Sequence, residues 1–351
     1  MSATRPAVLA ASDDLTADYD VALLDLDGVV YVGADPVPGA AAALTAVRAR
    51  GMRLAYVTNN ASRHPAEVAA LLSGMGVPAA ADEVVTSAQA AGHLLRDRLP
   101  PGSSVLIVGS AALADEVRAG GLVPVRTATP MPTAVVQGYS PDIGWRDLAE
   151  AAIAVRGGAL WVATNTDSTL PSARGPLPGN GALVAAVRTA TGAVPEVVGK
   201  PQPGLHRESV ERTGARRPLV VGDRLDTDIE GAVAAGADSM IVLTGVTTAD
   251  ELIAAAGGQR PTYMAADVTG LLQQHPPVVW EQTRATCRGF AAALEGGALV
   301  LSGAGADPVD ALRALCAVSW GAEPAVRAIR PSGEPAAVAL RQLGIRTSRG
   351  A

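Results

Sequence analysis

The chain has 351 residues, 48% of them apolar and 18% charged, so it is long enough for two or three packed domains and too apolar to be disordered. A net charge of -6 and an aromatic content of 3% argue against nucleic acid, which binds basic surfaces and stacks on rings. The two cysteines form no C-x-x-C pair, which favours a reducing, cytoplasmic setting. No apolar segment approaches the roughly 20 residues that cross a bilayer, so we expect a soluble protein that does not bind membranes.

The first hundred residues predict a strand, a helix and a second strand. Residues 21–24 are a continuous apolar run ending in Asp-Leu-Asp-Gly, as in a buried parallel strand that meets a polar loop. Residues 40–50 have apolar side chains at helical spacing, and residues 53–57 form a strand that enters Thr-Asn-Asn. Further helices are expected over 67–73 and near 88–98.

A second α/β unit is predicted in the middle of the chain. Apolar runs at 104–108, 134–137 and 160–163 alternate with helical stretches, which indicates a domain inserted over residues 88–195. Residues 165–181 are rich in Pro, Gly, Ser and Asn and are predicted to form a loop that can face a ligand.

The last third of the chain is expected to complete the first sheet and then to form another domain. The runs at 197–198 and 219–222 are predicted to return to the first sheet, and 240–243 to add its last strand. Pro276 and Pro277 mark a linker to a small α+β domain that includes a strand at 298–301. The fold of this domain could resemble that of small acyl-transferase modules. Its sequence contains no recognisable motif for binding an acyl-coenzyme, so we do not predict acyl-transferase activity.

Charged or hydroxyl side chains follow four of these apolar runs. They are Asp25 with Asp27, Thr58, Lys200, and Asp223 with Asp228. Residues just past the carboxyl ends of parallel strands converge on one crevice, so these side chains are expected to meet there. Clustered carboxylates repel one another unless a cation lies among them, and Mg²⁺ is the expected ion because it takes carboxylates, waters and a substrate phosphate.

These residues predict phosphoryl chemistry. With Mg²⁺ screening the negative charge and Lys200 holding the phosphate oxygens, Asp25 can attack phosphorus. Asp27 can protonate the leaving alkoxide and later deprotonate the water that cleaves the acyl phosphate. The prediction is a phosphatase that acts on small phosphate monoesters through an aspartyl-phosphate intermediate.

Four sequence motifs resemble those of the haloacid dehalogenase (HAD) superfamily in order and in strand context. They are Asp25-Leu26-Asp27-Gly28-Val29, Thr58-Asn59-Asn60, Val198-Gly199-Lys200-Pro201, and Gly222-Asp223-Arg224-Leu225-Asp226-Thr227-Asp228. The resemblance spans about residues 20–265. It implies a Rossmann-like parallel-sheet HAD core from 1–87 and 196–270 and an inserted α/β type-two cap over 88–195. The segment after Pro277 is not part of the resemblance, and residues 276–351 are expected to form a small C-terminal α+β accessory domain.

The same resemblance implies a role for each motif residue. Asp25 and Asp223 would bind magnesium through their side chains, and Asp27 through its backbone carbonyl. Thr58 and Asn59 would hold the phosphate together with Lys200. Asp228 would support the metal shell.

The segment from Ala163-Thr164-Asn165-Thr166-Asp167 to Pro178-Gly179-Asn180-Gly181 is similar to the cap loop of one HAD branch. That branch contains phosphatases of phosphoglycolate, pyridoxal phosphate, nitrophenyl phosphate and glycerol 3-phosphate. Asn165 and Asp167 are the cap-loop site residues it implies. Within the branch, an alanine-rich, lysine-poor composition makes glycerol 3-phosphate the first choice of substrate and phosphoglycolate the second.

Two alternatives stay open at this point. The chain could be a metabolite-binding regulatory protein acting through its C-terminal domain, although the intact set of acids argues against an inactive phosphatase core. It could also pass the phosphoryl group to another alcohol instead of water. The sequence leaves the oligomeric state undecided, a homodimer included.

Overall fold

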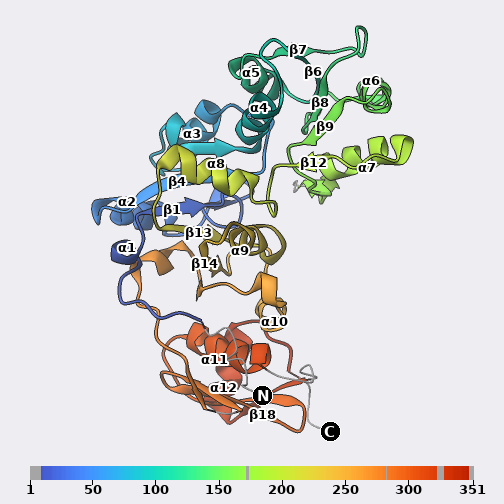
Figure 1. Ribbon diagram of the computed structural model, residues 1–351. Helices are drawn as coiled ribbons and strands as arrows, with labels where there is room; N and C mark the ends of the chain where they lie inside the picture. Colours follow the sequence, from blue (N-terminus) through green and yellow to red (C-terminus); the bar gives the residue numbers. More distant parts are fainter. Residues whose placement is uncertain (1–8, 171–173, 282, 322–327, 348–351) are drawn as a thin grey trace, which may run out of the picture. The chain divides into compact units, whose positions relative to one another are not determined.

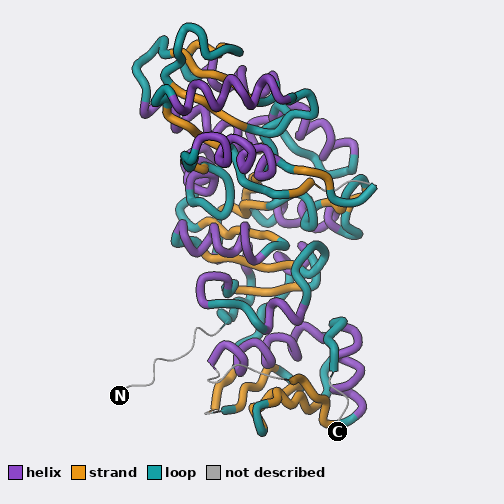
Figure 2. The backbone as a smooth tube through the Cα atoms, turned by 90° about the vertical axis from the view of Figure 1, so that its right-hand side faces the viewer, coloured by secondary structure: helices purple, strands orange, loops and turns teal. Residues whose placement is uncertain are grey.

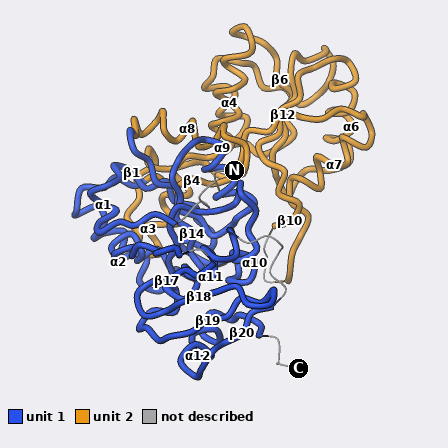
Figure 3. Tube along the Cα trace, turned by 60° about the horizontal axis from the view of Figure 1, so that its bottom comes forward, with its two compact units in different colours: residues 1–32, 36–54, 216–351 blue, residues 33–35, 55–215 orange. Residues whose placement is uncertain are grey.

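The computed structural model (Figure 1) describes residues 9–170, 174–281, 283–321 and 328–347, which fall into two compact units (Figure 3). Unit 1 comprises residues 1–32, 36–54 and 216–351, and unit 2 comprises residues 33–35 and 55–215. No helix within the described ranges has the length and apolar character needed to cross a membrane.

Unit 1 contains a parallel sheet in the strand order β15, β14, β13, β1. These strands are β1 (Val21–Leu24), β13 (Pro218–Gly222), β14 (Asp238–Val242) and β15 (Tyr263–Ala265). Nearly all of their residues are buried, as expected for a parallel sheet covered on both faces. The strands predicted at 21–24, 219–222 and 240–243 are confirmed.

Short helices and turns surround this sheet. They are α1 (Leu15–Asp18), α2 (Ala40–Ala49), η2 (Leu225–Ile229), α9 (Glu230–Ala235), α10 (Ala249–Ile253), η3 (Gly257–Gln259) and η4 (Val268–Leu272), with the short strand β2 (Tyr31–Val32). Helix α2 confirms the helix predicted over 40–50, and it packs against η4.

The C-terminal part of unit 1 has its own five-stranded sheet, which confirms the predicted α+β domain. Its order is β16 (Val279–Glu281), β17 (Arg284–Cys287), β18 (Phe290–Glu295), β19 (Ala298–Gly303) and β20 (Ala328–Ser332). The pairings are antiparallel except between β19 and β20, which are parallel and are connected through α11 (Pro308–Gly321). Helix α12 (Glu334–Gln342) follows β20, and both helices lie beside the sheet (Figure 2).

One hydrophobic core joins the C-terminal domain to the first sheet. Leu312 and Leu315 of α11 belong to the same cluster of buried side chains as Ile241 of β14, Met264 of β15 and Leu299 of β19. Helix α11 therefore packs on both sheets of unit 1, and the C-terminal domain is not a loosely tethered module.

Unit 2 begins with the two parallel strands β4 (Arg53–Thr58) and β5 (Val84–Thr86), the first of which starts in unit 1. Around them lie α3 (Pro65–Gly74), η1 (Ala81–Glu83), α4 (Ser87–Arg98) and α8 (Gly204–Thr213), while the short strand β3 (Asp35–Pro36) begins in unit 2 and ends in unit 1. Helix α4 begins at a capping box, in which the Thr86 hydroxyl accepts from the N–H of Gln89 and the Gln89 side chain accepts from the N–H of Thr86.

The second sheet of unit 2 is wholly parallel, in the order β12, β9, β8, β6, β7. Its strands are β6 (Ser104–Val108), β7 (Val123–Val125), β8 (Ala134–Gln137), β9 (Leu160–Ala163) and β12 (Glu196–Val197). The helices between these strands are α5 (Ala111–Ala119), α6 (Trp145–Arg156) and α7 (Asn180–Thr191). Helices α6 and α7 pack on each other and share one core with its strands, through side chains such as Ala151, Trp161 and Val184. The expected second α/β unit is confirmed.

One predicted strand joins a different sheet. The run at 197–198 was expected to return to the first sheet, but β12 pairs with β9, where Val197 lies opposite Ala163. That prediction is wrong. A run of two apolar residues before a charged residue is compatible with a strand in either sheet, and only the pairing with a distant strand decides between the two.

The segment 165–181 is more ordered than the predicted loop. It contains the antiparallel pair β10 (Thr169–Leu170) and β11 (Leu177–Pro178), and α7 already begins at Asn180. Residues 171–173 of this segment lie outside the described residues. Strands of two residues are too short to leave a periodic pattern in the sequence.

Candidate active site

The loop after β1 carries Asp25 and Asp27 and turns sharply. The backbone N–H of Asp25 donates to the carbonyl of Val221 (2.8 Å), so pairing with β13 fixes the start of the loop. The backbone N–H of Gly28 donates to the carbonyl of Tyr31 (2.7 Å). Gly28 has a φ of 90°, which glycine adopts without strain. The sequence Asp-Leu-Asp-Gly therefore closes a tight turn that keeps Asp25 at the carboxyl end of the sheet.

Asp223 and Asp228 follow β13, and each is only 1% exposed. The backbone N–H of Val246 donates to Oδ2 of Asp223 (2.7 Å). The backbone N–H of Arg224 donates to Oδ2 of Asp228 (3.1 Å), which lies in the π-helical turn η2. These backbone donors orient both carboxylates, so neither depends on a flexible side chain for its position.

Three of the predicted acids form one cluster in unit 1. Each of Asp25, Asp223 and Asp228 offers a carboxylate oxygen, and these oxygens lie within 4.8 Å of one another. Two of the three residues are buried and Asp25 is half-buried. Carboxylates this close repel strongly in a medium of low dielectric, so the arrangement calls for a cation. An all-oxygen donor set suits a hard divalent ion such as Mg²⁺.

Glycines line this cluster where any side chain would collide with it. A Cβ added at Gly28 would lie 2.4 Å from Cγ of Asp223, and one added at Gly245 would lie 1.9 Å from Oδ2 of the same residue. At Gly222 an added Cβ would lie 2.2 Å from Cβ of Asp228. The backbone thus approaches both carboxylates closely, and a side chain at any of these three glycines would displace an acid of the cluster that fits the expected magnesium.

The predicted phosphate-binding residues lie in unit 2. Lys200 is only 4% exposed, and its Nζ donates to the carbonyl of Val57 (3.4 Å). The backbone N–H of Lys200 donates to Oδ1 of Asn59 (2.8 Å), and Nδ2 of Asn59 donates to the carbonyl of Lys200 (3.2 Å). Thr58 ends β4, and its hydroxyl accepts from the backbone N–H of Asn60 (3.1 Å). A buried ammonium group and a fixed carboxamide in one place suit an anionic ligand.

The predicted cap-loop residues reach the same part of unit 2. Nδ2 of Asn165 donates to the backbone carbonyl of Asn59 (2.7 Å). Oδ1 of Asn165 accepts from the backbone N–H of Asp167 (3.2 Å), and Nδ2 of Asn59 lies 3.3 Å from Oδ2 of Asp167. Asn59 is therefore held from one side by Lys200 and from the other by the cap loop.

Asn180 takes part in this network and was missed by the sequence analysis. It is 1% exposed, and its Nδ2 donates to the carbonyl of Asn165 (2.7 Å). The glycines beside it are required by close backbone packing, because a Cβ at Gly179 would lie 2.3 Å from the carbonyl oxygen of Asp167 and one at Gly181 2.2 Å from that of Thr166. The pattern Gly-Asn-Gly at a helix start was the available signal.

The predicted residues thus fall into two groups, one in each unit. Unit 1 holds Asp25, Asp27, Asp223 and Asp228, and unit 2 holds Thr58, Asn59, Lys200, Asn165 and Asp167. The first group gathers around its carboxylates, with Asp27 in the turn opposite Tyr31. The second gathers around the Asn59 carboxamide.

Comparison with known families identifies the class of protein that this fold and these acids define. Residues 22–123 match the family described as haloacid dehalogenase-like hydrolase, and residues 197–271 match a second HAD-hydrolase-like family. The chain belongs to the HAD-like hydrolases, which confirms the expected family, fold class and enzyme class. Residues 287–345 match a GCN5-related N-acetyltransferase like domain, in keeping with the acyl-transferase-like fold considered for this segment.

Similar proteins narrow the comparison further. The chain is 56% identical over 259 residues to a D-glycerol 3-phosphate phosphatase from Mycobacterium tuberculosis, covering 74% of this chain and 72% of the relative. A crystal structure of a glycerol phosphate phosphatase from that organism, in complex with magnesium, is 48% identical, with a TM-score of 0.88 over 95% of this chain and 99% of the other. An acid sugar phosphatase from Staphylococcus saprophyticus is 36% identical, covering 73% of this chain and 98% of the relative.

Proposed function

We propose that this HAD hydrolase is a Mg²⁺-dependent phosphatase of glycerol 3-phosphate that works through an aspartyl phosphate on Asp25. The observation that carries the proposal is the cluster of Asp25, Asp223 and Asp228, whose carboxylate oxygens lie within 4.8 Å of one another. Identity of 56% to a D-glycerol 3-phosphate phosphatase supports the choice of substrate.

In this proposal the acids of unit 1 divide the chemistry. Asp25 is the nucleophile, and Asp27, two residues further along the turn, is the general acid and then the general base. Asp25, Asp223 and the backbone carbonyl of Asp27 would hold Mg²⁺, and Asp228 would support them from beside the ion. When bound, the ion screens the negative charge of the carboxylates from that of the phosphate. The backbone donors to Asp223 and Asp228 keep those carboxylates oriented through the reaction.

The residues of unit 2 are proposed to bind the phosphate. Lys200 would neutralise its negative charge, while the hydroxyl of Thr58 and the residue after it, Asn59, would hold its oxygens. Asn165 and Asp167 of the cap loop would fix the direction of Asn59. Their hydrogen bonds to Asn59 support this role.

The substrate is tested by measuring phosphate release from a panel of esters in the presence of Mg²⁺. We expect the highest kcat/KM for glycerol 3-phosphate, with its two enantiomers distinguished, above phosphoglycolate, nitrophenyl phosphate and a sugar phosphate. A higher value for phosphoglycolate would refute the substrate. Phosphoryl transfer to an added alcohol that exceeds phosphate release would instead identify a transferase.

The nucleophile is tested by Asp25→Asn, which should reduce turnover to background and prevent phosphate labelling of the protein. Asp226→Asn is the matched control. Asp226 is exposed in the turn after β13, where it pairs with Arg224, and it has no assigned role. Equal loss of activity in both variants would show that the assay reports general damage and not the nucleophile.

We also propose the division into a core (1–87 and 196–270), a cap (88–195) and a C-terminal domain (276–351). The separate sheet of β6, β7, β8, β9 and β12 supports an inserted domain, and its strand β12 (Glu196–Val197) extends that sheet two residues past the proposed boundary at 195. Limited proteolysis with mapping of the cut sites tests these boundaries.

For its surroundings we propose the reducing cytoplasm, without nucleic-acid or membrane partners. Cys287 and Cys316 are free and buried, and burial raises the pKa of Cys287 to about 12, so neither thiol is poised to form a disulfide. A homodimer is the assembly to test first, by light scattering on the purified chain.

A further inference from the structure

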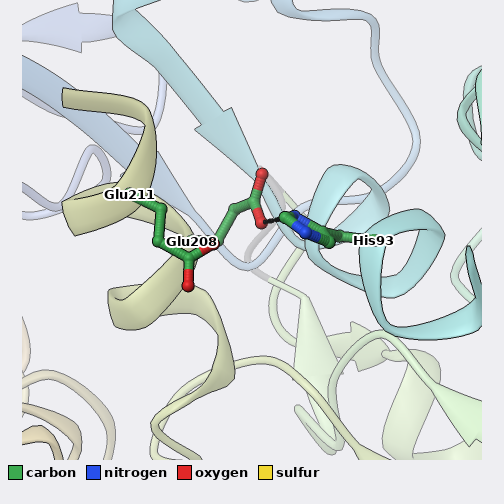
Figure 4. A group of neighbouring side chains, drawn as sticks. All are labelled: His93, Glu208 and Glu211. Atoms are coloured by element: carbon green, nitrogen blue, oxygen red, sulfur yellow. Dashed lines mark hydrogen bonds and ion pairs between the residues drawn. The ribbon is translucent and has the colours of Figure 1, made fainter. Parts of the chain in front are cut away.

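A second group of metal-ligating side chains lies in unit 2, between two helices that the proposed chemistry does not use. Helix α4 contributes His93, and helix α8 contributes Glu208 and Glu211 (Figure 4). One ligand atom from each of the three lies within 4.8 Å of the others. Glu208 and Glu211 are three residues apart, so they share one face of α8.

Glu208 is the fixed member of this group. It is 5% exposed, and its Oε2 lies 2.5 Å from Nδ1 of His93. Its other oxygen, Oε1, accepts a hydrogen bond from Nε of Arg212. The two oxygens thus have different partners, and the one that faces His93 is available to an ion without disturbing the contact with Arg212.

A second carboxylate on the same helix lies near the imidazole of His93. Nε2 of His93 lies 3.7 Å from Oδ2 of Asp97, one turn further along α4. A histidine that binds a metal through one ring nitrogen commonly turns the other nitrogen to a carboxylate, which sets the tautomer and the ring direction. In this structure Nδ1 of His93 is directed at Glu208, and Nε2 is on the side of Asp97.

Negative charge is in excess around the group. The three carboxylates of Glu208, Glu211 and Asp97 are opposed by two guanidinium groups, that of Arg212 beside Glu208 and that of Arg96 beside Asp97. Glu116 of α5 adds another carboxyl group, whose pKa is raised by burial and, to a lesser extent, by the charge of Glu208. A divalent cation would offset this excess at a point where two carboxylates and an imidazole converge.

We propose that His93, Glu208 and Glu211 form a binding site for a divalent transition metal ion of the Zn²⁺ class, distinct from the carboxylate cluster of unit 1. One imidazole nitrogen and two carboxylate oxygens suit Zn²⁺, with water completing the shell, whereas Mg²⁺ favours oxygen ligands alone. Binding of the ion would separate Nδ1 of His93 from Oε2 of Glu208, which lie 2.5 Å apart, and the proton of their hydrogen bond would be released to solvent.

Such an ion would brace two helices next to the proposed phosphate-binding residues. Helix α4 begins directly after β5, and α8 begins four residues after Lys200. An ion bound to both helices joins segments more than 100 residues apart in the chain, so its binding stabilises the folded state of unit 2. Its role in the molecule is structural, and it touches no reacting atom.

The site is tested with Co²⁺, which has visible absorption bands when a protein supplies nitrogen and oxygen ligands. The full chain, without a polyhistidine tag, is kept in excess Mg²⁺ and titrated with CoCl₂. We expect one equivalent to bind with these bands, and ZnCl₂ to displace it and raise the Tm. His93→Gln keeps a neutral hydrogen-bonding side chain beside Glu208, and it should abolish the bands.

Two further variants locate the bound ion at these three residues. Glu211→Gln, at an exposed position, should weaken Co²⁺ binding by about tenfold or more without loss of fold. His64→Gln is the matched control, because His64 also forms a histidine–carboxylate pair, with Asp115 at 3.5 Å, and it should leave binding unchanged.

Three results would overturn the proposal: no Co²⁺ bands in the wild-type chain, bands that survive His93→Gln, or bands that are lost in Asp223→Asn instead. None of these results bears on Mg²⁺-dependent phosphate release, so the proposed phosphatase function stands or falls separately.

Discussion

Gly245 is the position at which a single methyl group should do most harm to the proposed magnesium site. An added Cβ would lie 1.9 Å from Oδ2 of Asp223 and 2.5 Å from its Cγ. Real Cβ atoms essentially never approach another heavy atom within 3.0 Å, so Gly245→Ala must displace the carboxylate or the loop by about 1.1 Å (3.0 − 1.9). The same displacement strains the hydrogen bond from the N–H of Val246 to Oδ2 of Asp223, which is 2.7 Å long in the wild-type chain.

A shift of this size has a predictable kinetic cost. Misplacing a catalytic group by about 1 Å can reduce the rate about 100-fold, and loss of a group that orients a metal ligand typically reduces metal affinity or activity about 10- to 100-fold. We therefore expect Gly245→Ala to lower kcat/KM about 10- to 100-fold and to raise the Mg²⁺ concentration needed for half-maximal activity. The measurement is phosphate release as a function of Mg²⁺ concentration, alongside a thermal melt.

Gly257→Ala is the matched control for this experiment. An added Cβ at Gly257 meets nothing within 4 Å, and the residue lies in the short helix η3 of the same unit. It should leave both kcat/KM and the Mg²⁺ dependence unchanged. Near-normal Mg²⁺ dependence in folded Gly245→Ala would refute the claim that Asp223 must keep its position.

Three further predictions follow from buried polar groups. Arg313→Met should lower the free energy of unfolding, measured by chemical denaturation, by about 3–5 kcal/mol. The reason is that it removes the guanidinium group that pairs at 2.7 Å with the carboxylate of Asp310, a residue that is only 2% exposed. The double variant Arg313→Met with Asp310→Leu should recover much of that loss. Burial lowers the pKa of His275 to about 4 from its usual 6.5. The contribution of neutral His275 to the free energy of unfolding is therefore complete above about pH 6.5, and up to about 3 kcal/mol is lost as the pH falls toward 4. In thermal melts across this range His275→Gln should flatten the pH dependence of the Tm, and an unchanged slope would contradict this assignment. Asn180→Ala should lower kcat/KM about tenfold, because it removes the hydrogen bond from Nδ2 of Asn180 to the carbonyl of Asn165 in the cap loop. The Mg²⁺ concentration needed for half-maximal activity should change little. An increase in that concentration of about tenfold would argue against a role limited to the cap loop.

The carboxylate cluster could be predicted from sequence because two simple patterns coincide. Residues 21–24 and 219–222 are continuous apolar runs, and each ends directly in an acid. Continuous runs predict parallel strands, and the carboxyl ends of neighbouring parallel strands lie at one edge of a sheet. The register pairs Leu24 with Val221, which brings Asp25 and Asp223 to that edge together.

The pairing of β12 could not be predicted in the same way. Val197 and Val198 precede Lys200 as the longer runs precede the acids, but two apolar residues carry no information about the partner strand. Contacts with residues far away in the chain decide the outcome, here the parallel pairing of Val197 with Ala163. The motif predicted Lys200 as a site residue, but it did not predict which sheet the preceding strand β12 joins.

Asn180 shows the same limit for side-chain networks. Its role depends on the backbone of residues 165–167 passing within reach, and that path is set by glycines whose close packing is visible only in three dimensions. A single asparagine at the start of a helix ordinarily indicates a cap. Sequence reasoning therefore finds the acids and the lysine, whose chemistry is unusual where they stand, more readily than the amides that hold them.

The packing of the C-terminal domain argues for a structural role. Arg313 of α11 donates to the carbonyl of Met264 (2.6 Å), and Trp320 donates to the carbonyl of Leu252 (3.0 Å), so this helix satisfies backbone groups of the first sheet and of α10. Buried carbonyl groups that lose such donors are costly, and removing α11 would also expose the apolar side chains it covers. If the C-terminal domain moved when it bound a metabolite, each movement would have to break these hydrogen bonds. Deletion of residues 276–351 should therefore leave an insoluble or unstable core, whereas a folded core with altered kinetics would favour regulation.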